Sequence, residues 1–146
     1  MRRLRQKGFT LTEMLLVTAV MVILMAIGAP LYASLNNNNQ LDAAVSVLAQ
    51  DLYQAQTYSR NQAQDSQWGV AANGQTITLF SGASYATRNT SQDVVYAVPS
   101  SVALSGTGEI VYSKLYGLPQ SAASFSLVSN SKTGNVVVNN KGMVEY

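Results

Sequence analysis

One carboxylate stands near the start of a long apolar segment, and it is the clearest chemical signal in the chain. From Phe9 to Leu31 the only charged residue is Glu13. An ionised side chain inside a bilayer costs at least ~2.5–3.5 kcal/mol on insertion scales, so a carboxylate kept there indicates a function. Because a lone charge in a low dielectric is unfavourable, we expect Glu13 to need a positive partner.

The residues upstream of that segment are basic, and they predict its orientation. The apolar run is preceded by Arg2, Arg3, Arg5 and Lys7. An excess of Lys and Arg marks the cytoplasmic side of a membrane helix, and ~20 apolar residues match a ~30 Å hydrocarbon core. The sequence therefore predicts a single-pass membrane helix with Glu13 at its cytoplasmic edge.

Most catalytic and metal-binding chemistry is excluded by composition. The 146 residues contain neither His nor Cys. Imidazole general bases, Ser-His-Asp triads, cysteine nucleophiles and the usual zinc sites are therefore ruled out. No carboxylate pair or Ser-Lys dyad forms a recognisable motif, and Asp65, Asp93 and Glu109 do not make the close run of oxygen ligands that calcium loops use. We expect no enzymatic activity, no metal and no cofactor.

Residues 7–30 resemble the N-terminus of the type IV pilin family, which includes the pseudopilins. In that family a basic leader ends in Gly, Phe usually follows, and Glu is the fifth residue of the processed chain; here these are Gly8, Phe9 and Glu13. The resemblance implies cleavage between Gly8 and Phe9 by a prepilin peptidase, and N-methylation of the new Phe9 amine. It also implies that Glu13 neutralises the amine of a neighbouring subunit in a filament. Thr12, where the family commonly has a large aliphatic residue, is a mild departure.

The spacing of these residues has a physical reason of its own. A helix beginning at Phe9 would place Glu13 four residues on, one turn down the same face. The carboxylate would then lie at the depth of a neighbour's amino terminus if that subunit were displaced by about a turn. Near the other end of the apolar run, Gly28 and Pro30 predict a kink, because proline removes a helical hydrogen bond.

Three other interpretations of the N-terminus stay open. The segment could be an ordinary signal anchor with an incidental Glu13. It could be a removable secretory signal, since Ala26-Ile27-Gly28 is a passable cleavage site, although the apolar run exceeds the ~7–15 residues of a typical signal core. Finally, the chain could be a membrane-tethered binding protein that never polymerises.

The charge of the chain depends on whether residues 1–8 are removed. Their loss takes away four of the nine basic residues and leaves five against seven acidic ones, a formal net charge of −2. The pI of about 9.0 thus belongs to the precursor. The remaining basic residues are scattered, so no nucleic-acid site is evident.

Four regions are predicted: a leader at 1–8, a hydrophobic helix at 9–35, an amphipathic helix at 36–67 and a β domain at 68–146. The second helical region has Leu41, Ala44, Val45, Leu48, Leu52 and Ala55 on one face, which needs a sheet to cover it. A helix from Phe9 to about Gln64 would be on the order of 80 Å long. That is too long for a compact domain of this size, so we expect its apolar half to project.

After Trp68 the chain changes to short β-branched and aromatic runs separated by Gly, Asn and Ser. The predicted strands are Trp68–Ala71, Thr76–Phe80, Val94–Val98, Ile110–Tyr112, Phe125–Val128, Asn135–Val138 and Met143–Tyr146. Asn73-Gly74 and Asn139–Gly142 indicate hairpins. The expected fold class is α+β, a long helix packed on an antiparallel sheet as in pilins. The chain after Leu41 also faintly resembles minor pseudopilins with two small sheets.

The family resemblance implies a structural subunit that polymerises into a type IV pilus-like cell-surface filament for adhesion, twitching motility or DNA uptake. The alternative is a minor pilin or pseudopilin of a type II secretion or competence system. Implied partners are copies of the chain or other pilins, a prepilin peptidase, an inner-membrane assembly platform and the membrane itself. The precursor would reside in the inner membrane, and the processed subunit in an extracellular pilus.

Overall fold

The computed structural model describes residues 8–130 and 132–146, apart from the side chains of Ala29 and Pro30. These residues form α1 (Leu11–Arg60), the 3-10 helices η1 (Ala63–Asp65), η2 (Tyr85–Thr87) and η3 (Thr90–Gln92), and the strands β1 (Trp68–Asn73), β2 (Thr76–Ser81), β3 (Val94–Ala97), β4 (Ala103–Gly106), β5 (Glu109–Tyr112), β6 (Ala123–Ser129), β7 (Lys132–Val138) and β8 (Val144–Glu145). The described residues divide into two units, one that ends at Asn36 and one that runs from Asn37 to Tyr146.

The helical part of the first unit exposes its apolar surface. Leu11 is 80% exposed, and Leu16 and Leu24 are 66% and 65% exposed. Among the described residues, α1 contains the stretch that is long and apolar enough to cross a membrane, with a mean hydropathy of 2.5 over its most apolar window. An uncovered apolar surface of this size needs lipid or protein around it.

In the second unit, α1 buries one face. Leu41, Leu48 and Leu52 are each 0% exposed, as the predicted apolar stripe requires. The helix ends at Arg60, earlier than the predicted limit of residue 67. The physical reason is that Gln62 and Gln64 adopt left-handed φ angles of 51° and 57°, in which an α-helix of L-residues cannot continue.

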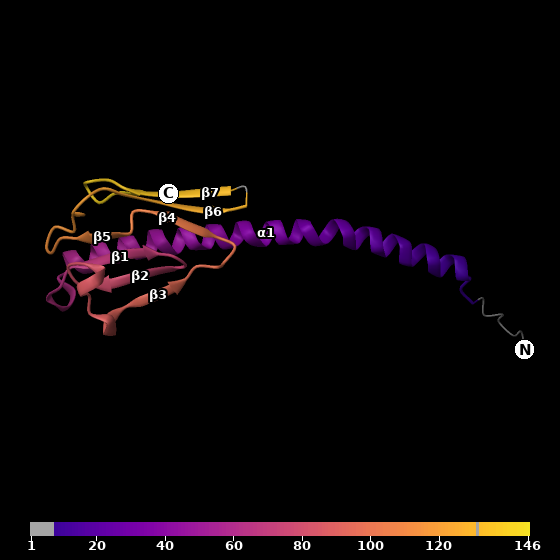
Figure 1. Cartoon of the computed structure of the whole chain (residues 1–146), viewed down its shortest axis with the longest axis horizontal. Coiled ribbons are helices and arrows are strands. Elements are labelled where there is room, and N and C mark those ends of the chain that lie inside the picture. The colour runs from indigo at the N-terminus through magenta and orange to yellow at the C-terminus, as the bar shows by residue number, and fades with distance from the viewer. Residues whose placement is uncertain (1–7, 131) are drawn as a thin grey trace, which may run out of the picture. The chain divides into compact units, whose positions relative to one another are not determined.

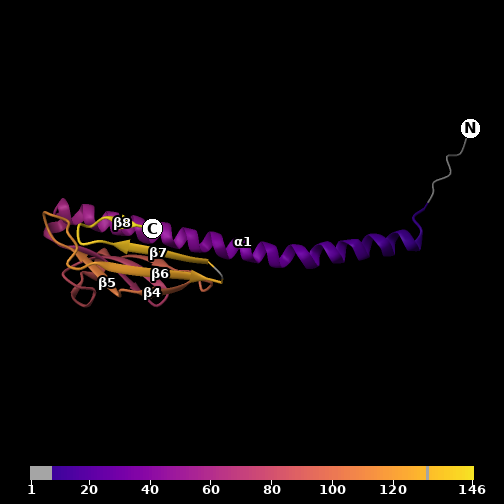
Figure 2. The same cartoon turned by 90° about the horizontal axis from the view of Figure 1, so that it is seen from above.

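The β domain contains two antiparallel four-stranded sheets rather than the single sheet predicted. Their strand orders are β3-β2-β1-β5 and β4-β6-β7-β8. Figures 1 and 2 show the second half of α1 running along both sheets, with β2 and β3 on one side of it and β6 and β7 on the other in Figure 1. The seven predicted strands are present. β4 was missed because Ala103-Leu-Ser-Gly106 lacks a β-branched or aromatic pattern.

A single core joins this half of α1 to both sheets. Val70 and Ile77 come from the first sheet, Phe125 and Val136 from the second, and all four are fully buried. A smaller cluster on the outer face of the first sheet contains Ala71, Phe80 and Val111, and Tyr85 packs on it. The helix is therefore positioned by side chains from both sheets.

Candidate assembly sites

The predicted cleavage site lies in an exposed segment without helix or strand. Gly8 and Phe9 both precede the first residue of α1, and both are exposed. The Gly8–Phe9 bond is therefore exposed and outside any helix or strand, where a peptidase could reach it. The cleavage and the methylation of Phe9 remain predictions.

Glu13 forms a capping box with Thr10 at the start of α1. The Thr10 backbone N–H donates to Glu13 Oε2 at 2.9 Å, and the Thr10 hydroxyl donates to the same oxygen at 2.9 Å. The Glu13 N–H in turn lies 3.3 Å from the Thr10 hydroxyl oxygen. This reciprocal arrangement satisfies helix N–H groups that otherwise lack partners. The sequence pattern Thr10-x-x-Glu13 is the local signal for this cap.

The capping box gives the Glu13 carboxylate hydrogen-bond partners within its own chain. Glu13 is not without hydrogen-bond donors in the isolated chain, because Thr10 supplies two. Both donate to Oε2. A carboxylate accepts about four hydrogen bonds in total, so Oε1 keeps capacity for a positive group from another molecule. The site can therefore hold its carboxylate in a defined position before any partner arrives.

Gly28 and Pro30 lie within the helical span of α1. The position of a Cβ on Gly28 would meet no other atom within 4 Å, so packing inside the described chain does not require this glycine. The Pro30 side chain lies outside the described residues. The kink at these positions thus stays a prediction.

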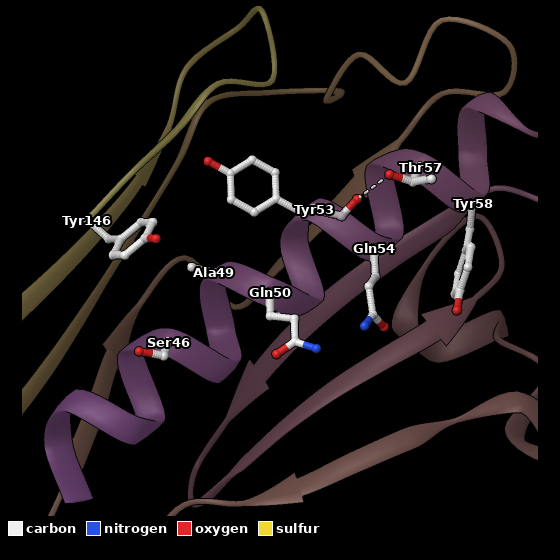
Figure 3. Close-up of a pocket in the computed structure, with 8 residues that line it drawn as sticks. All are labelled: Ser46, Ala49, Gln50, Tyr53, Gln54, Thr57, Tyr58 and Tyr146. Carbon is white, nitrogen blue, oxygen red and sulfur yellow. Dashed lines mark hydrogen bonds between the residues drawn. The ribbon is translucent and has the colours of Figure 1, made fainter. Parts of the chain in front are cut away.

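The outer face of α1 in the second unit carries an uncharged groove of about 360 Å³ (Figure 3). Its lining is Ser46, Ala49, Gln50, Tyr53, Gln54, Thr57 and Tyr58 of α1, together with Tyr146. The Tyr53 hydroxyl donates to Val144 O at 3.3 Å. The Tyr58 and Trp68 rings pack edge to face, with their centres 4.8 Å apart. A solvated helix face normally carries charges, so this neutral face is suited to contact with another uncharged surface.

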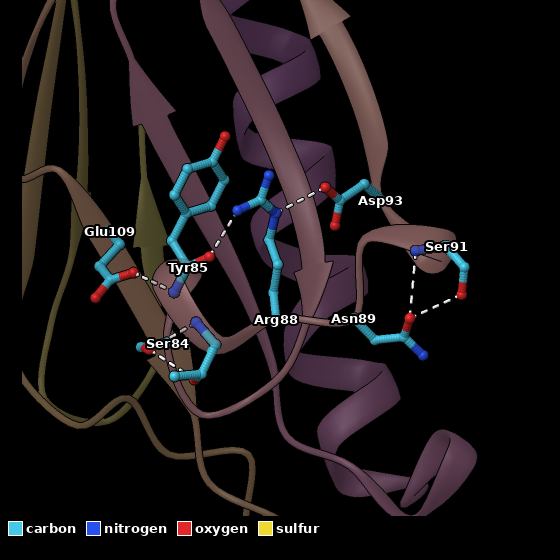
Figure 4. Close-up of polar contacts among 8 residues, drawn as sticks. Ser84, Tyr85, Arg88, Asn89, Ser91, Asp93 and Glu109 are labelled. Carbon is cyan, nitrogen blue, oxygen red and sulfur yellow. Dashed lines mark hydrogen bonds and ion pairs between the residues drawn. The ribbon is translucent and has the colours of Figure 1, made fainter.

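A cluster of polar contacts holds the loop between β2 and β3 in place (Figure 4). Arg88 Nε lies 2.7 Å from Asp93 Oδ2 in an ion pair. The guanidinium carbon of Arg88 lies 3.7 Å from the centre of the Tyr85 ring. The Tyr85 N–H donates to Glu109 Oε2 at 2.7 Å. These contacts hold Tyr85 against the small cluster around Phe80. The cluster therefore has a structural role.

The three carboxylates considered as calcium ligands are not brought together. Asp93 pairs with Arg88 and Glu109 accepts from Tyr85, as above, whereas Asp65 pairs with Lys114 at 2.6 Å. Lys114 lowers the pKa of Asp65 by hydrogen bonding and by its charge. In the part of the chain that the structure describes, no three metal-binding side chains gather in one place.

Two comparisons with known proteins gave matches, one to the N-terminal segment and one to the fold. Residues 3–29 match the family described as the prokaryotic N-terminal methylation motif. The fold is similar to the structure of the minor pseudopilin EpsH from the type 2 secretion system of Vibrio cholerae. The TM-score is 0.56 at 11% sequence identity, and the match covers 73% of this chain and 94% of that one. No curated protein matches the sequence significantly.

Proposed function

We propose that this chain is a filament-building subunit of the type IV pilin and pseudopilin kind; its match to the N-terminal methylation motif and its fold support this role. In this role the processed chain starts at Phe9. Copies of it, alone or mixed with related subunits, stack through the apolar part of α1. The precursor is anchored in the membrane by the same segment.

The observation that carries this proposal is the position of Glu13 within the matched motif. The motif spans residues 3–29, and its one acidic residue lies in the first turn of α1. The large apolar side chains described between Leu11 and Leu35 are all exposed, from 46% at Val17 to 80% at Leu11. Neighbouring helices would cover that surface and would bring a Phe9 amine to Oε1 of Glu13. Assembly then removes both an apolar exposure and an unpaired charge.

A minor pseudopilin of a secretion system is a second candidate. The two-sheet domain favours it, because the similar structure belongs to a minor pseudopilin and is matched over 94% of its length. A subunit of this kind would occupy few positions in a filament. The major-pilus role in adhesion, motility or DNA uptake predicts an abundant subunit instead.

Substitution of Glu13 tests the proposed filament role. We expect Glu13→Ala to lower the amount of this chain in sheared filaments at least about tenfold, because the Phe9 amine of a neighbour would lack its counter-ion. Membrane insertion should not change, since the variant helix is more apolar. Glu145→Ala serves as the control, because Glu145 is an exposed carboxylate on β8.

Mass spectrometry of the filament fraction provides the readout. It reports the abundance of the chain, cleavage after Gly8 and methylation of Phe9 together. Normal filaments containing Glu13→Ala subunits would overturn the role given to this carboxylate. A mature protein that begins beyond Leu31 would overturn the filament proposal itself.

A further inference from the structure

The loop of residues 113–118, which follows β5, displays a group of large apolar side chains. Leu115, Tyr116 and Leu118 are 61%, 72% and 44% exposed. Among the described residues of the second unit, no other stretch of four positions exposes three large apolar side chains. Single exposed apolar residues are normal, whereas a contiguous group indicates an interaction surface.

Hydrogen bonds hold this loop in one conformation. Within the loop, the Ser113 N–H donates to Leu118 O at 2.8 Å, and the Gly117 N–H donates to Ser113 O at 2.9 Å. The loop is also attached to the end of α1, because the Leu115 N–H donates to Ser59 O at 3.2 Å. A surface that is already ordered loses little conformational entropy when it binds a partner.

The backbone of Leu115 is strained without any benefit to the core. Its φ angle is 71°, in the left-handed region, where a bulky residue is an outlier. Glycine adopts this region without strain, and the exposed Leu115 side chain fills no space inside the chain. Strained backbone of this kind concentrates at functional sites. The strain therefore indicates that Leu115 contacts another molecule.

The uncharged groove on α1 has the size and the chemistry to accept this loop. Its volume of about 360 Å³ lies within the ~300–1,000 Å³ of typical ligand pockets, so it has room for large side chains. Ala49 is the smallest lining residue and lies beside Tyr53 and Tyr146 (Figure 3). No lining side chain is charged, so a charged side chain placed there would lose water without gaining a counter-ion.

The loop meets the requirements for such an occupant. Lys114 is its one charged residue, and its ammonium group is already paired with Asp65 at 2.6 Å. No residue of the loop lines the groove, so the two are separate surfaces of the same unit. Each copy can therefore donate one loop and accept another. Contacts of this heterologous kind build open filaments when they do not close into a ring.

We propose that the loop of one subunit inserts Leu115 and Tyr116 into the α1 groove of a second copy of this chain. The Tyr116 ring would pack on the tyrosines of the groove, and Leu115 would cover the surface beside Ala49. The inference rests on the filament role proposed above.

The small size of the contact favours a neighbour that is already held in the filament. A specific interface needs at least ~1,000 Å² of buried surface, and two or three side chains bury less than that. Stacking of α1 would present the loop to the groove at high effective concentration. The loop can therefore bind in the filament although the contact is weak by itself.

Disulfide cross-linking tests the contact directly, because the chain has no cysteine of its own. Tyr116→Cys is combined with Gln50→Cys, which alters an exposed residue of the groove. A disulfide needs Cα atoms within about 7 Å, whereas Gln50 lies about 13 Å along α1 from Ser59, which anchors the loop. Cross-links therefore form between copies.

We expect oxidised filaments of the double variant to give a ladder of covalent oligomers, at least about tenfold stronger than in either single variant. The matched control combines Tyr116→Cys with Val137→Cys, because Val137 is 41% exposed and lies outside the groove. This control should give no ladder, and a dimer without higher oligomers in the Gln50 variant would contradict a heterologous contact.

Leu115→Gly provides the second arm, because glycine relieves the φ strain while it removes the apolar side chain. We expect this variant to keep the melting temperature of the unsubstituted chain in detergent micelles, and to enter filaments about fivefold less. Val137→Ala removes an apolar side chain elsewhere and should stay within about twofold of the unsubstituted chain. A purely structural role of Leu115 would not give this combination.

The outcomes separate this contact from the filament role. Filaments that contain the double variant but give no more ladder than the Val137 control would overturn the loop contact and leave the filament role intact. If the double variant does not assemble, normal incorporation of Leu115→Gly would overturn the contact. Absence of the unsubstituted chain from every filament fraction would overturn both proposals.

Discussion

Two carboxylates of α1 lie in opposite electrostatic surroundings. Glu13 is exposed and accepts two hydrogen bonds from Thr10. Asp51 is only 8% exposed, and burial raises its pKa to about 6. It lies one helical turn from Leu48 and Ala55, which belong to the core. Its charged form is therefore disfavoured by folding, whereas its neutral form is not.

The raised pKa predicts a pH-dependent contribution of Asp51 to stability. The folded-state pKa exceeds the unfolded value, so this residue is least unfavourable below about pH 4, and stability falls as the pH rises through about 6. We expect Asp51→Asn to raise the free energy of unfolding at pH 7 by about 1–3 kcal/mol, since each pKa unit corresponds to 1.36 kcal/mol. At pH 4 the two proteins should differ little.

Chemical unfolding of the full chain in detergent at several pH values checks this expectation. Asp42→Asn is the control, because Asp42 is exposed and pairs with Lys132 on the surface; it should change stability by no more than about 1 kcal/mol. A difference between Asp51→Asn and the unsubstituted chain that is independent of pH would contradict the assigned cause.

At the scale of elements, the two ends of α1 are determined by different chemistry. Its start is defined by side chains, because Thr10 and Glu13 satisfy each other's backbone N–H groups. Its end is defined by backbone conformation at Gln62 and by Ser59, whose hydroxyl accepts from the Trp68 N–H at 2.9 Å. The start of α1 can be predicted from the local sequence, whereas its end depends on a contact with β1.

The capping box predicts the behaviour of Thr10 variants. Thr10→Val removes the hydroxyl that both accepts and donates, and loss of such a cap costs about 0.5–2 kcal/mol of helix stability. We expect the Glu13 amide of the chain in micelles to exchange with solvent about 3- to 30-fold faster. Thr10→Ser keeps the hydroxyl and should behave like the unsubstituted chain. Equal exchange in Val and Ser variants would argue against the capping box.

At the scale of the whole molecule, the core lies entirely within one unit. Among the residues whose burial the structure describes, the buried apolar ones all fall between Leu41 and Val144, inside the unit Asn37–Tyr146. The other unit has an exposed apolar helix, which needs surroundings that the chain alone does not provide. We therefore expect the domain to fold whether or not the apolar N-terminal helix is buried.

This separation predicts that a chain beginning at Asn37 folds without its N-terminal helix. It should be soluble and unfold cooperatively, because it keeps the core contacts of α1 with both sheets. Near-ultraviolet circular dichroism of Trp68, which is 5% exposed, should report fixed packing. An aggregated product, or one without a cooperative transition, would show that the two units depend on each other.

Local patterns were sufficient to predict the membrane-type segment, the apolar face of α1 and seven of the eight strands, because periodicity and turn residues act over a few neighbours. The resemblance to the N-terminus of pilins singled out Gly8, Phe9 and Glu13, whose roles in cleavage, methylation and assembly stay predictions. Only the tertiary structure separated the strands into two sheets and left the β3 edge open. Those features arise from pairing between residues far apart in the chain, such as Gly106 with Phe125, and alternating hydrophobicity does not specify which strand pairs with which.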